Sequence, residues 1–533
     1  MNKKLIVFGL DGATFDIILP LVKEGKLPNI ERLIKNGVYG TLESSIPPVT
    51  FPAWKCYSTG KKPSTLGVYH FFKVSIKNKR IYATSQKDFK VKEIWDYLGS
   101  KNYKVLISEM PTTYPPKRVN GIMISGFPVI GKNYTYPEDL RRLLEKDIGY
   151  TPNTPEPDSS NIDQIIQDRL NRIEQSFKLA KYLIEKYNYT FDFIHTTIFY
   201  IDSIQHLTYN YFFDKSSLGH YLEKAWKVID NNIGELMKML GNEFNVILMS
   251  DHGFQNFYKR FNLNAWLIRK GYLKVNLGKF STLALKFGIT AGNIAPILKK
   301  LRLLDFIRKL IPREIRGRLP QADGGFIAGF LGDKIDWDKT KAFSIGDNLI
   351  YINKYNMSIH EYETLREKII AELYKIRDPD TGKGVFRKIL KAEEVYGNNP
   401  FNDDSSPDIV IIPEKGYLIF DSIKDKIWEN ASETRWRGIH DLYGIFIAYG
   451  EDIKKGYEIE GAKIYDLAPT ILHMFGLPIP KDMDGRVLME IFEPDSEPAR
   501  RQPVYVDPSY YERLDERKAL KSAIKNLKLK GKI

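Results

Sequence analysis

Short apolar runs recur along this chain, and segments with helical periodicity separate most of them. The first run, residues 5–10, ends in Asp11-Gly12, a pair typical of a turn that follows a buried strand. Alternating strands and helices favour a mostly parallel sheet with helices on both faces. We therefore predict an α/β fold whose ligand sites lie at the carboxyl ends of the strands. Further strands are expected at 105–107, 121–124, 191–199, 246–249, 408–412 and 444–448, and helices at 16–24, 28–35, 161–187 and 222–240.

Two stretches interrupt this alternation. Residues 126–160 are rich in Pro, Tyr and Asn, which predicts a loop-rich insertion. Residues 255–335 have helical patterns with no strand between them, which predicts a basic helical insertion or cap. We interpret both as insertions into one catalytic core rather than as separate domains. The core then consists of residues 1–125, 161–254 and 336–490, and residues 491–533 form a basic C-terminal tail.

Composition narrows the class of protein. With the single cysteine Cys56, the chain forms no intramolecular disulfide and no cysteine-based zinc site, so Asp, Glu and His must hold any metal. The sequence contains no run of about 20 apolar residues, so it predicts no membrane span. The apolar run 5–10 is too short for the core of a signal peptide. We therefore expect a cytoplasmic protein. The net charge of +14 suits an anionic substrate, anionic lipid or nucleic acid, and equally a solvated basic surface.

Acids and histidines gather where the predicted strands end. Asp202 and His206 follow the run 191–199, and their four-residue spacing places them on one face of a helix. Each such feature alone is commonplace, as a turn or as a local helix pair. Together they predict ligands for two metal ions at one edge of the sheet. The set consists of Asp11, Asp202, His206, Asp251, His252 and His440.

Thr50 stands out in the segment IPPVTFPAW. Pro47 and Pro48 favour an extended approach, and Pro52 suits the first turn of a helix, so Thr50 is expected at the N-cap. Capping alone would account for its hydroxyl. A hydroxyl there also faces the positive end of the helix dipole, where phosphate binds, and a metal ion would make it a nucleophile.

In this order, the motifs GLDGATFD, IPPVTFPAW with STGKKP, YIDSIQH, MSDHGF and GIH resemble the alkaline phosphatase superfamily. The likeness is greatest to the type I phosphodiesterase/nucleotide pyrophosphatase-like branch, whose archaeal and bacterial members are predicted phosphohydrolases or phosphomutases. It extends over about residues 1–490. The resemblance implies an alkaline phosphatase-like fold and a hydrolase that cleaves phosphate mono- or diesters through a phosphothreonine at Thr50.

The resemblance also implies two divalent metal ions. One would be bound by Asp202, His206 and His440, and the other by Asp11, Asp251 and His252. Zinc is the usual metal of the phosphodiesterase branch, and manganese serves in the related mutases. Carboxylate and imidazole ligands do not decide between these two metals.

The sequence also departs from the family pattern. Nucleotide pyrophosphatases have Asn at the position of Ala53, and here no Asn lies about twenty residues beyond the nucleophile. The phosphate-orienting residue is therefore not identified, and the substrate-binding candidates are Lys61, Lys62 and His70. Cys56 is followed by Tyr57 and does not match the motif from which sulfatases make formylglycine.

Two other functions remain open. A phosphomutase would use the same nucleophile and metals, and a catalytically inactive basic protein would only bind. Residues 286–318 contain nine basic and two acidic residues among apolar ones. This segment reads either as a structural cap or as a basic helix that attracts a phosphorylated small-molecule or lipid-linked substrate. A basic amphipathic helix also suits peripheral association with an anionic membrane, whereas no recognised nucleic-acid motif is present.

Overall fold

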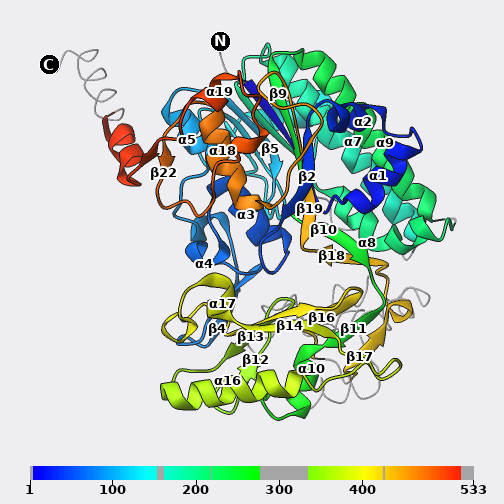
Figure 1. Ribbon diagram of the computed structural model, residues 1–533, viewed down its shortest axis with the longest axis vertical. Helices are drawn as coiled ribbons and strands as arrows, with labels where there is room; N and C mark the ends of the chain where they lie inside the picture. The colour runs from blue at the N-terminus through cyan, green and yellow to red at the C-terminus, as the bar shows by residue number, and fades with distance from the viewer. Residues whose placement is uncertain (1–3, 153–160, 217, 277–333, 424–425, 518–533) are drawn as a thin grey trace. The chain divides into compact units, whose positions relative to one another are not determined.

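The computed structural model describes residues 4–152, 161–216, 218–276, 334–423 and 426–517 (Figure 1). The chain divides into two compact units. Unit 1 consists of Met1–Leu66, Ser85–Phe254 and His440–Ile533, and unit 2 consists of Gly67–Thr84 and Gln255–Ile439. The sequence placed residues 336–439 in the catalytic core, but they belong to unit 2, because most of their strands pair within that unit.

A ten-stranded sheet, counted over the described residues, forms the centre of unit 1. Its strand order is β20-β2-β19-β9-β1-β8-β5-β6-β7, with β21 beside β2. The neighbours β6, β5, β8, β1 and β9 run parallel, and β19 is antiparallel to both β9 and β2. The mostly parallel sheet predicted from the sequence is therefore confirmed. The bounds are β1 Lys4–Leu10, β2 Val38–Glu43, β5 Val105–Met110, β6 Gly121–Ser125, β7 Thr135–Tyr136, β8 Phe193–Ile198, β9 Phe244–Met249, β19 Tyr443–Tyr449, β20 Tyr457–Glu458 and β21 Ala462–Lys463.

Helices cover both faces of this sheet (Figure 1). Successive side chains of a strand point to opposite faces. In β1, the Phe8 ring packs 6.5 Å from the ring of Phe177 in one helical layer, whereas Gly9 lies against Trp54 in the other layer. The first layer contains α1 Phe15–Lys23, α2 Pro28–Lys35, α7 Ile162–Lys186, α8 Tyr200–Phe213 and α9 Gly219–Leu240. The second contains α3 Thr50–Thr59, α5 Ile94–Ser100 and α18 Leu467–Met474.

The largest apolar core lies between the sheet and the first helical layer. In α9, residues three or four apart share one face, and Leu222, Trp226, Ile229 and Ile233 are fully buried there. Each such side chain stabilises the fold by roughly 1.5–3 kcal/mol on burial. This packing lies beneath the strands whose ends carry the candidate site residues.

Residues 126–152 are not only loops, as the sequence suggested. They contain β7, which pairs with β6 at the sheet edge, and the helix α6 Leu140–Ile148. Leu140 and Leu144 recur one turn apart and bury that helix against the core. The short α6 pattern lies between prolines and tyrosines, which obscured it. The smaller elements of unit 1 are α4 Pro63–Leu66, α19 Glu497–Arg500, β22 Ile479–Pro480, β23 Tyr505–Val506 and the 3-10 helices η1 Gln86–Asp88, η4 Ile464–Asp466 and η5 Met489–Ile491.

Unit 2 is built on antiparallel strands. One sheet has the order β12-β13-β15-β14, and another has the order β16-β11-β17. The strand expected at 408–412 is β15, but it lies in this unit and not in the core sheet. The bounds are β3 Phe72–Ser75, β4 Arg80–Ala83, β11 Lys259–Asn262, β12 Ala342–Phe343, β13 Leu349–Ile352, β14 Phe386–Lys391, β15 Ile409–Pro413, β16 Tyr417–Phe420, β17 Trp428–Asn430, α10 Leu263–Arg269, α16 Ile359–Leu373, α17 Ala392–Tyr396, η2 Pro400–Asn402 and η3 Ala431–Glu433. Two further strands, β10 Gly253–Asn256 and β18 Gly438–Asp441, span the points where the chain passes from one unit to the other.

The prediction that residues 255–335 contain no strand is wrong at β11. This strand is buried over its whole length between β16 and β17, although its sequence KRFN has two basic residues. Polar partners within unit 2 hold these residues, as Lys259 pairs with Asp378 at 2.6 Å. The basic segment 286–318 lies outside the described residues.

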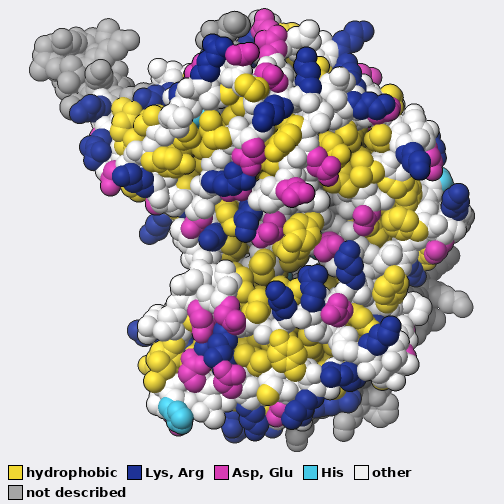
Figure 2. Space-filling view, in the orientation of Figure 1, with side chains coloured by type: hydrophobic (Ala, Val, Ile, Leu, Met, Phe, Trp, Pro, Cys, Tyr) yellow, Lys and Arg dark blue, Asp and Glu magenta, His cyan; other side chains and the backbone are white. Residues whose placement is uncertain are grey.

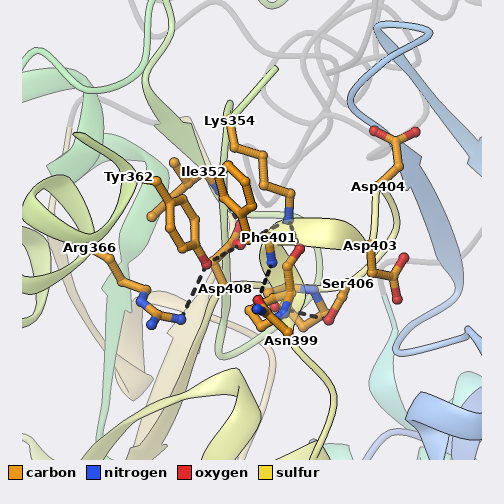
Figure 3. A network of polar contacts seen from close by, with 12 residues as sticks. Ile352, Lys354, Tyr362, Arg366, Asn399, Phe401, Asp403, Asp404, Ser406 and Asp408 are labelled. Atoms are coloured by element: carbon orange, nitrogen blue, oxygen red, sulfur yellow. Dashed lines mark hydrogen bonds and ion pairs between the residues drawn. The ribbon is translucent and has the colours of Figure 1, made fainter. Parts of the chain in front are cut away.

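A buried polar network stabilises unit 2 (Figure 3). The fully buried Asp408 carboxylate accepts hydrogen bonds from Lys354 Nζ at 2.9 Å, the Tyr362 hydroxyl at 2.8 Å and the Ile352 amide at 2.6 Å. Arg366 donates in turn to the Tyr362 hydroxyl at 3.2 Å. Each charge in this network has a partner of opposite sign or a hydrogen bond, as buried ions require.

The surface carries mixed charge. On the face drawn in Figure 2, Lys and Arg side chains lie among Asp and Glu and do not form one basic patch. Among the described helices, no segment is both long and apolar enough to cross a membrane.

Candidate metal centre

The strand ends bring the predicted ligands together within unit 1. In the register of the sheet, Leu10 of β1 pairs with Ile198 of β8, and Gly9 pairs with Met249 of β9, so the three strands stop at one level. Asp11 directly follows β1, and Asp251-His252 follow β9. Asp202 and His206 lie one turn apart in α8, the helix after β8, and His440 lies in β18.

Asp11, Asp251 and His252 form the first candidate group. Their ligand atoms all lie within 4.8 Å of one another. His252 Nε2 lies 3.3 Å from Asp251 Oδ2 and 3.7 Å from Asp11 Oδ1. The three side chains are fully buried. This is the same set that the sequence resemblance implied for one metal.

Asp202, His206 and His440 form the second candidate group. His206 Nε2 lies 3.5 Å from Asp202 Oδ2 and 3.1 Å from His440 Nε2. His440 Nε2 lies 3.3 Å from Asp202 Oδ1. His252 is within reach of this group too, because Asp202, His252 and His440 also offer ligand atoms within 4.8 Å, and the rings of His252 and His440 stack at 3.7 Å. The two groups therefore adjoin at His252.

Gly12 and Gln205 support the groups, and neither was among the site residues predicted from the sequence. The Gly12 amide donates to Asp251 Oδ1 at 3.0 Å, and Gln205 Nε2 donates to the Gly12 carbonyl at 2.7 Å. Gly12 has a φ of +68°, in the left-handed region that favours glycine. The Asp-Gly pair after a strand predicts the turn at Gly12. No feature of the sequence around Gln205 predicts that its side chain bonds the Gly12 carbonyl.

Thr50 is the first residue of α3 and not its N-cap, which is Val49. No side chain makes a capping hydrogen bond to this helix. The expectation that the Thr50 hydroxyl caps α3 is therefore wrong, because Thr50 lies one residue after the N-cap. Its Oγ1 instead lies 3.3 Å from His252 Nε2. The buried hydroxyl thus faces the point where the two groups adjoin, at the positive end of the helix dipole.

The acids of the first group are short of positive charge. Burial, and then the negative charges of Asp251 and Asp202, raise the pKa of Asp11 well above its ordinary value. Burial, with the charge of Asp202, raises the pKa of Asp251 to about 7. Burial, and then the charge of His440, lower the pKa of His252 and keep its imidazole neutral.

The second group is better balanced. Burial would raise the pKa of Asp202, but the charges of His206 and His440 outweigh it and lower this pKa. Burial would lower the pKa of His440, but its contacts with Asp202 outweigh it and raise this pKa. Charge is thus matched around Asp202 and unmatched around Asp11 and Asp251.

The residues present fit divalent metal ions. Asp11 Oδ1 and Asp251 Oδ2 are buried and have no hydrogen-bond partner among the described residues. An unsatisfied buried oxygen normally costs about 1–3 kcal/mol, and more when it is charged. A cation placed among them would satisfy both oxygens and neutralise the pair. Carboxylate and neutral imidazole are ligands that zinc and manganese accept.

Two of the three substrate-binding candidates lie elsewhere in unit 1. Lys61 follows the far end of α3, and a ten-residue helix places it about 15 Å from Thr50. It forms an ion pair with Asp482 and is buried there, so it does not reach the candidate centre. Lys62 follows it, and its amide donates to Asp484 at 2.8 Å. His70 belongs to unit 2, where it packs against Gly346 and Phe72. These three residues were candidates because they follow Thr50 closely in the sequence. Helix α3 lies between Thr50 and all three, so closeness in sequence does not bring them to the candidate centre.

Residues 5–441 match the sequence model of the type I phosphodiesterase/nucleotide pyrophosphatase family. The chain belongs to this family. Membership confirms the resemblance to the alkaline phosphatase superfamily and supports a phosphoric ester hydrolase, in a family that generally uses divalent metals, typically zinc. No match was found among curated proteins.

A solved structure of human ectonucleotide pyrophosphatase/phosphodiesterase 5 is similar to this chain. The alignment covers 92% of this chain and 100% of the human chain, with a TM-score of 0.50 and 14% sequence identity. At this identity the likeness concerns the fold. It agrees with the helix-covered, mostly parallel sheet of the family.

Proposed function

We propose that the chain is a metal-dependent phosphohydrolase that cleaves phosphate mono- or diesters through a phosphothreonine at Thr50. The observation that carries the proposal is the position of the Thr50 hydroxyl, which lies 3.3 Å from His252 Nε2. His252 adjoins both candidate groups. A hydroxyl at this place, at a helix N-terminus, is arranged for attack on a phosphoryl group.

Six side chains would hold the metals. Asp11, Asp251 and His252 would hold one ion, and Asp202, His206 and His440 the other. When bound, two divalent ions supply the positive charge that lowers the pKa of the threonine hydroxyl and neutralises phosphoryl oxygens. We favour zinc because it is the typical metal of this family, and manganese is the alternative.

The residues of the chain perform a two-step displacement. Thr50 Oγ1 releases its proton to solvent and forms a bond to phosphorus, while the bond from phosphorus to the leaving oxygen breaks and the alcohol leaves with a proton taken from solvent. The positive end of the α3 dipole, where Thr50 lies, would stabilise the charge that develops on the phosphoryl oxygens. Water then attacks the phosphothreonine, the bond between phosphorus and Oγ1 breaks, and phosphate or a phosphomonoester leaves.

We propose a phosphorylated small molecule or a lipid-linked phosphate as the substrate. The net charge of +14 supports an anionic substrate in general. A phosphomutase would share the first step and return the phosphoryl group to another oxygen of the retained substrate. Product analysis separates these outcomes, because hydrolysis releases phosphate or a monoester and a mutase does not.

The test measures release of p-nitrophenol from p-nitrophenyl phosphate and bis-p-nitrophenyl phosphate. Dialysis against a chelator should abolish the release, zinc or manganese should restore it, and elemental analysis should approach two metals per chain. Full activity in a stringently metal-free preparation would contradict the proposal.

The nucleophile is tested by Thr50→Ala. This variant should lose turnover by about 10⁴-fold or more while it keeps its metals, because the acids and histidines hold them. Thr59→Ala is the matched control, since Thr59 is buried at the other end of α3, where its hydroxyl donates to the Lys55 carbonyl and accepts from the Lys61 amide. Near-native turnover of Thr50→Ala would exclude Thr50 as the nucleophile.

A further inference from the structure

Trp54 connects helix α3 to Asp11. It lies four residues after Thr50, so both side chains project from the same side of the helix. Trp54 is fully buried, and its indole Nε1–H donates to Asp11 Oδ2 at 3.1 Å. The helix that presents Thr50 therefore also contacts a candidate metal ligand.

This hydrogen bond distinguishes the two oxygens of Asp11. Oδ2 is engaged by the indole, whereas Oδ1 has no hydrogen-bond partner among the described residues and lies 3.7 Å from His252 Nε2. A carboxylate held at one oxygen cannot rotate freely about its side-chain bonds. The contact thus fixes which oxygen faces the candidate metal group.

Gly9 makes room for the indole. Gly9 is the second-last residue of β1, and Asp11 directly follows the strand, so Trp54 contacts both. A Cβ atom at Gly9 would lie 2.4 Å from Trp54 Cη2 and 2.9 Å from Cζ3, closer than real contacts allow. Gly9 therefore leaves space for the indole ring, and Asp11 accepts a hydrogen bond from its N–H.

His195 fixes the ring from the neighbouring strand. Its imidazole lies edge-on to Trp54, with the ring centroids 5.8 Å apart. The imidazole is itself held, because its Nδ1 lies 3.1 Å from the Tyr57 hydroxyl and its Nε2 lies 2.9 Å from Thr197 Oγ1. The indole is consequently locked in place between β1, β8 and α3.

Two other buried tryptophans show that this fold does not require an indole hydrogen bond for packing. Trp95 and Trp226 are fully buried, and their Nε1 atoms have no hydrogen-bond partner in the part of the chain that the structure describes. The N–H of Trp54 differs from theirs because it is aimed at a carboxylate of the candidate centre.

We propose that Trp54 is a positioning residue for metal binding. Its N–H holds Asp11 Oδ2 so that Oδ1 points to the metal, and through α3 it keeps Thr50 in register with that metal. The inference rests on the proposed function, because it assigns a role toward the metal that Asp11 would bind. Hydrogen bonds to ligands from such outer residues typically affect metal affinity or activity by 10- to 100-fold.

The test compares Trp54→Phe with the full-length wild-type chain. Phenylalanine keeps a buried aromatic ring and removes the N–H. Zinc affinity, measured by competition with a chromophoric chelator, should fall about 10- to 100-fold. Because Thr50 itself is retained, raising the free zinc concentration should restore part of the turnover.

Trp95→Phe and Trp226→Phe are the matched controls, and they should keep wild-type zinc affinity even if they lower the melting temperature. Gly9→Ala is a second, independent variant. It retains the indole N–H but displaces the ring, so zinc affinity should fall here too, and circular dichroism checks that each variant folds.

The outcomes separate two failures. Unchanged zinc affinity in folded Trp54→Phe or Gly9→Ala, with only a lower melting temperature, would mean that Trp54 merely packs and would overturn this inference alone. A wild-type chain that binds no zinc and no manganese would overturn the proposed function and this inference with it.

Discussion

Two kinds of buried carboxylate lie in unit 1, and their surroundings differ sharply. Asp11, which bonds Trp54, and Asp251 have oxygens without hydrogen-bond partners among the described residues, and burial raises the pKa of both. Glu93 is equally buried, yet it accepts hydrogen bonds from Lys55 at 2.8 Å and Ser58 at 2.9 Å.

Charge completes the contrast. Lys117 Nζ lies 2.7 Å from Glu93, so two ammonium groups face this carboxylate. Burial opposes its ionisation, but the charges of Lys117 and Lys55 outweigh burial and lower the pKa of Glu93 to about 2. A buried acid whose partners belong to the protein stabilises the fold. Buried acids that lack such partners, grouped with histidines, indicate a site that is completed by a ligand.

The largest contrast should come from Asp251→Asn. Removal of one proposed metal ligand should lower ester hydrolysis by about 1,000-fold or more. Stability of the metal-free protein should stay the same or rise, because the substitution removes a buried charge without a partner cation. Urea unfolding in the presence of a chelator, beside the p-nitrophenyl ester assays, checks both expectations. If metal-free Asp251→Asn is several kcal/mol less stable than the metal-free wild type, Asp251 stabilises the fold as Glu93 does, and the two kinds of carboxylate do not differ.

Glu93→Gln should show the opposite pattern. Lys55 and Lys117 would be left without their shared carboxylate, which should cost about 3–5 kcal/mol of unfolding free energy. Turnover per folded molecule should remain near that of the wild type. Glu243→Gln is the control, because Glu243 pairs with Lys4 at the surface and should matter little. Urea unfolding measures the stability of the wild type, Glu93→Gln and Glu243→Gln. Equal stability of the two variants would contradict the role given to Glu93.

The pH dependence of stability should sharpen the same difference. The pKa of Glu93 is lowered from 4.5 to about 2 on folding, so its carboxylate contributes stability above about pH 4.5. That contribution is lost as the pH falls from about 4.5 through 2, where the folded state must also take up the proton. The stability gap between wild type and Glu93→Gln should therefore narrow over this range. Thermal unfolding at a series of pH values measures it, and a constant gap would show that charge is not the cause.

Cys56→Ser should have the smallest effect. Cys56 is buried in α3, and burial raises the pKa of its thiol, so it is not a nucleophile. Turnover with p-nitrophenyl esters should be almost unchanged, since the residues after Cys56 do not match the sulfatase motif. A large loss of turnover in a folded variant would reopen the sulfatase interpretation.

Much of the fold could be predicted from local patterns. Strands β1, β5, β6, β8, β9 and β19 follow apolar runs, and helices α7 and α9 follow long helical periods, which a sequence reports directly. The central-sheet strands β2, β7, β20 and β21 were not expected from the sequence. The six candidate ligands were found because strand ends of a parallel sheet meet at one edge. Pairing between distant segments was not predictable, and for this reason β15 was assigned to the core sheet and β11 was missed.

Side-chain partners were the other gap. Trp54 precedes Lys55 in a helix with nothing local to indicate that one bonds Asp11 and the other Glu93. The same limit applies to Lys61, whose partner Asp482 lies 421 residues away. The cytoplasmic location and a membrane-associated role for residues 286–318 stay predictions.

The order of the ligands along the chain has a consequence for biosynthesis. His206 contacts His440 across 234 residues, and Asp11 contacts the other ligands from near the start of the chain. Strand β19, which lies between β9 and β2, follows His440 directly. The ribosome adds about 5–20 residues per second, so it must elongate for roughly 20–90 s after Asp11 before the last ligand exists. Until then the nascent polypeptide lacks β19 in its central sheet and lacks a complete set of ligands. Chaperones would bind the polypeptide in that incomplete state.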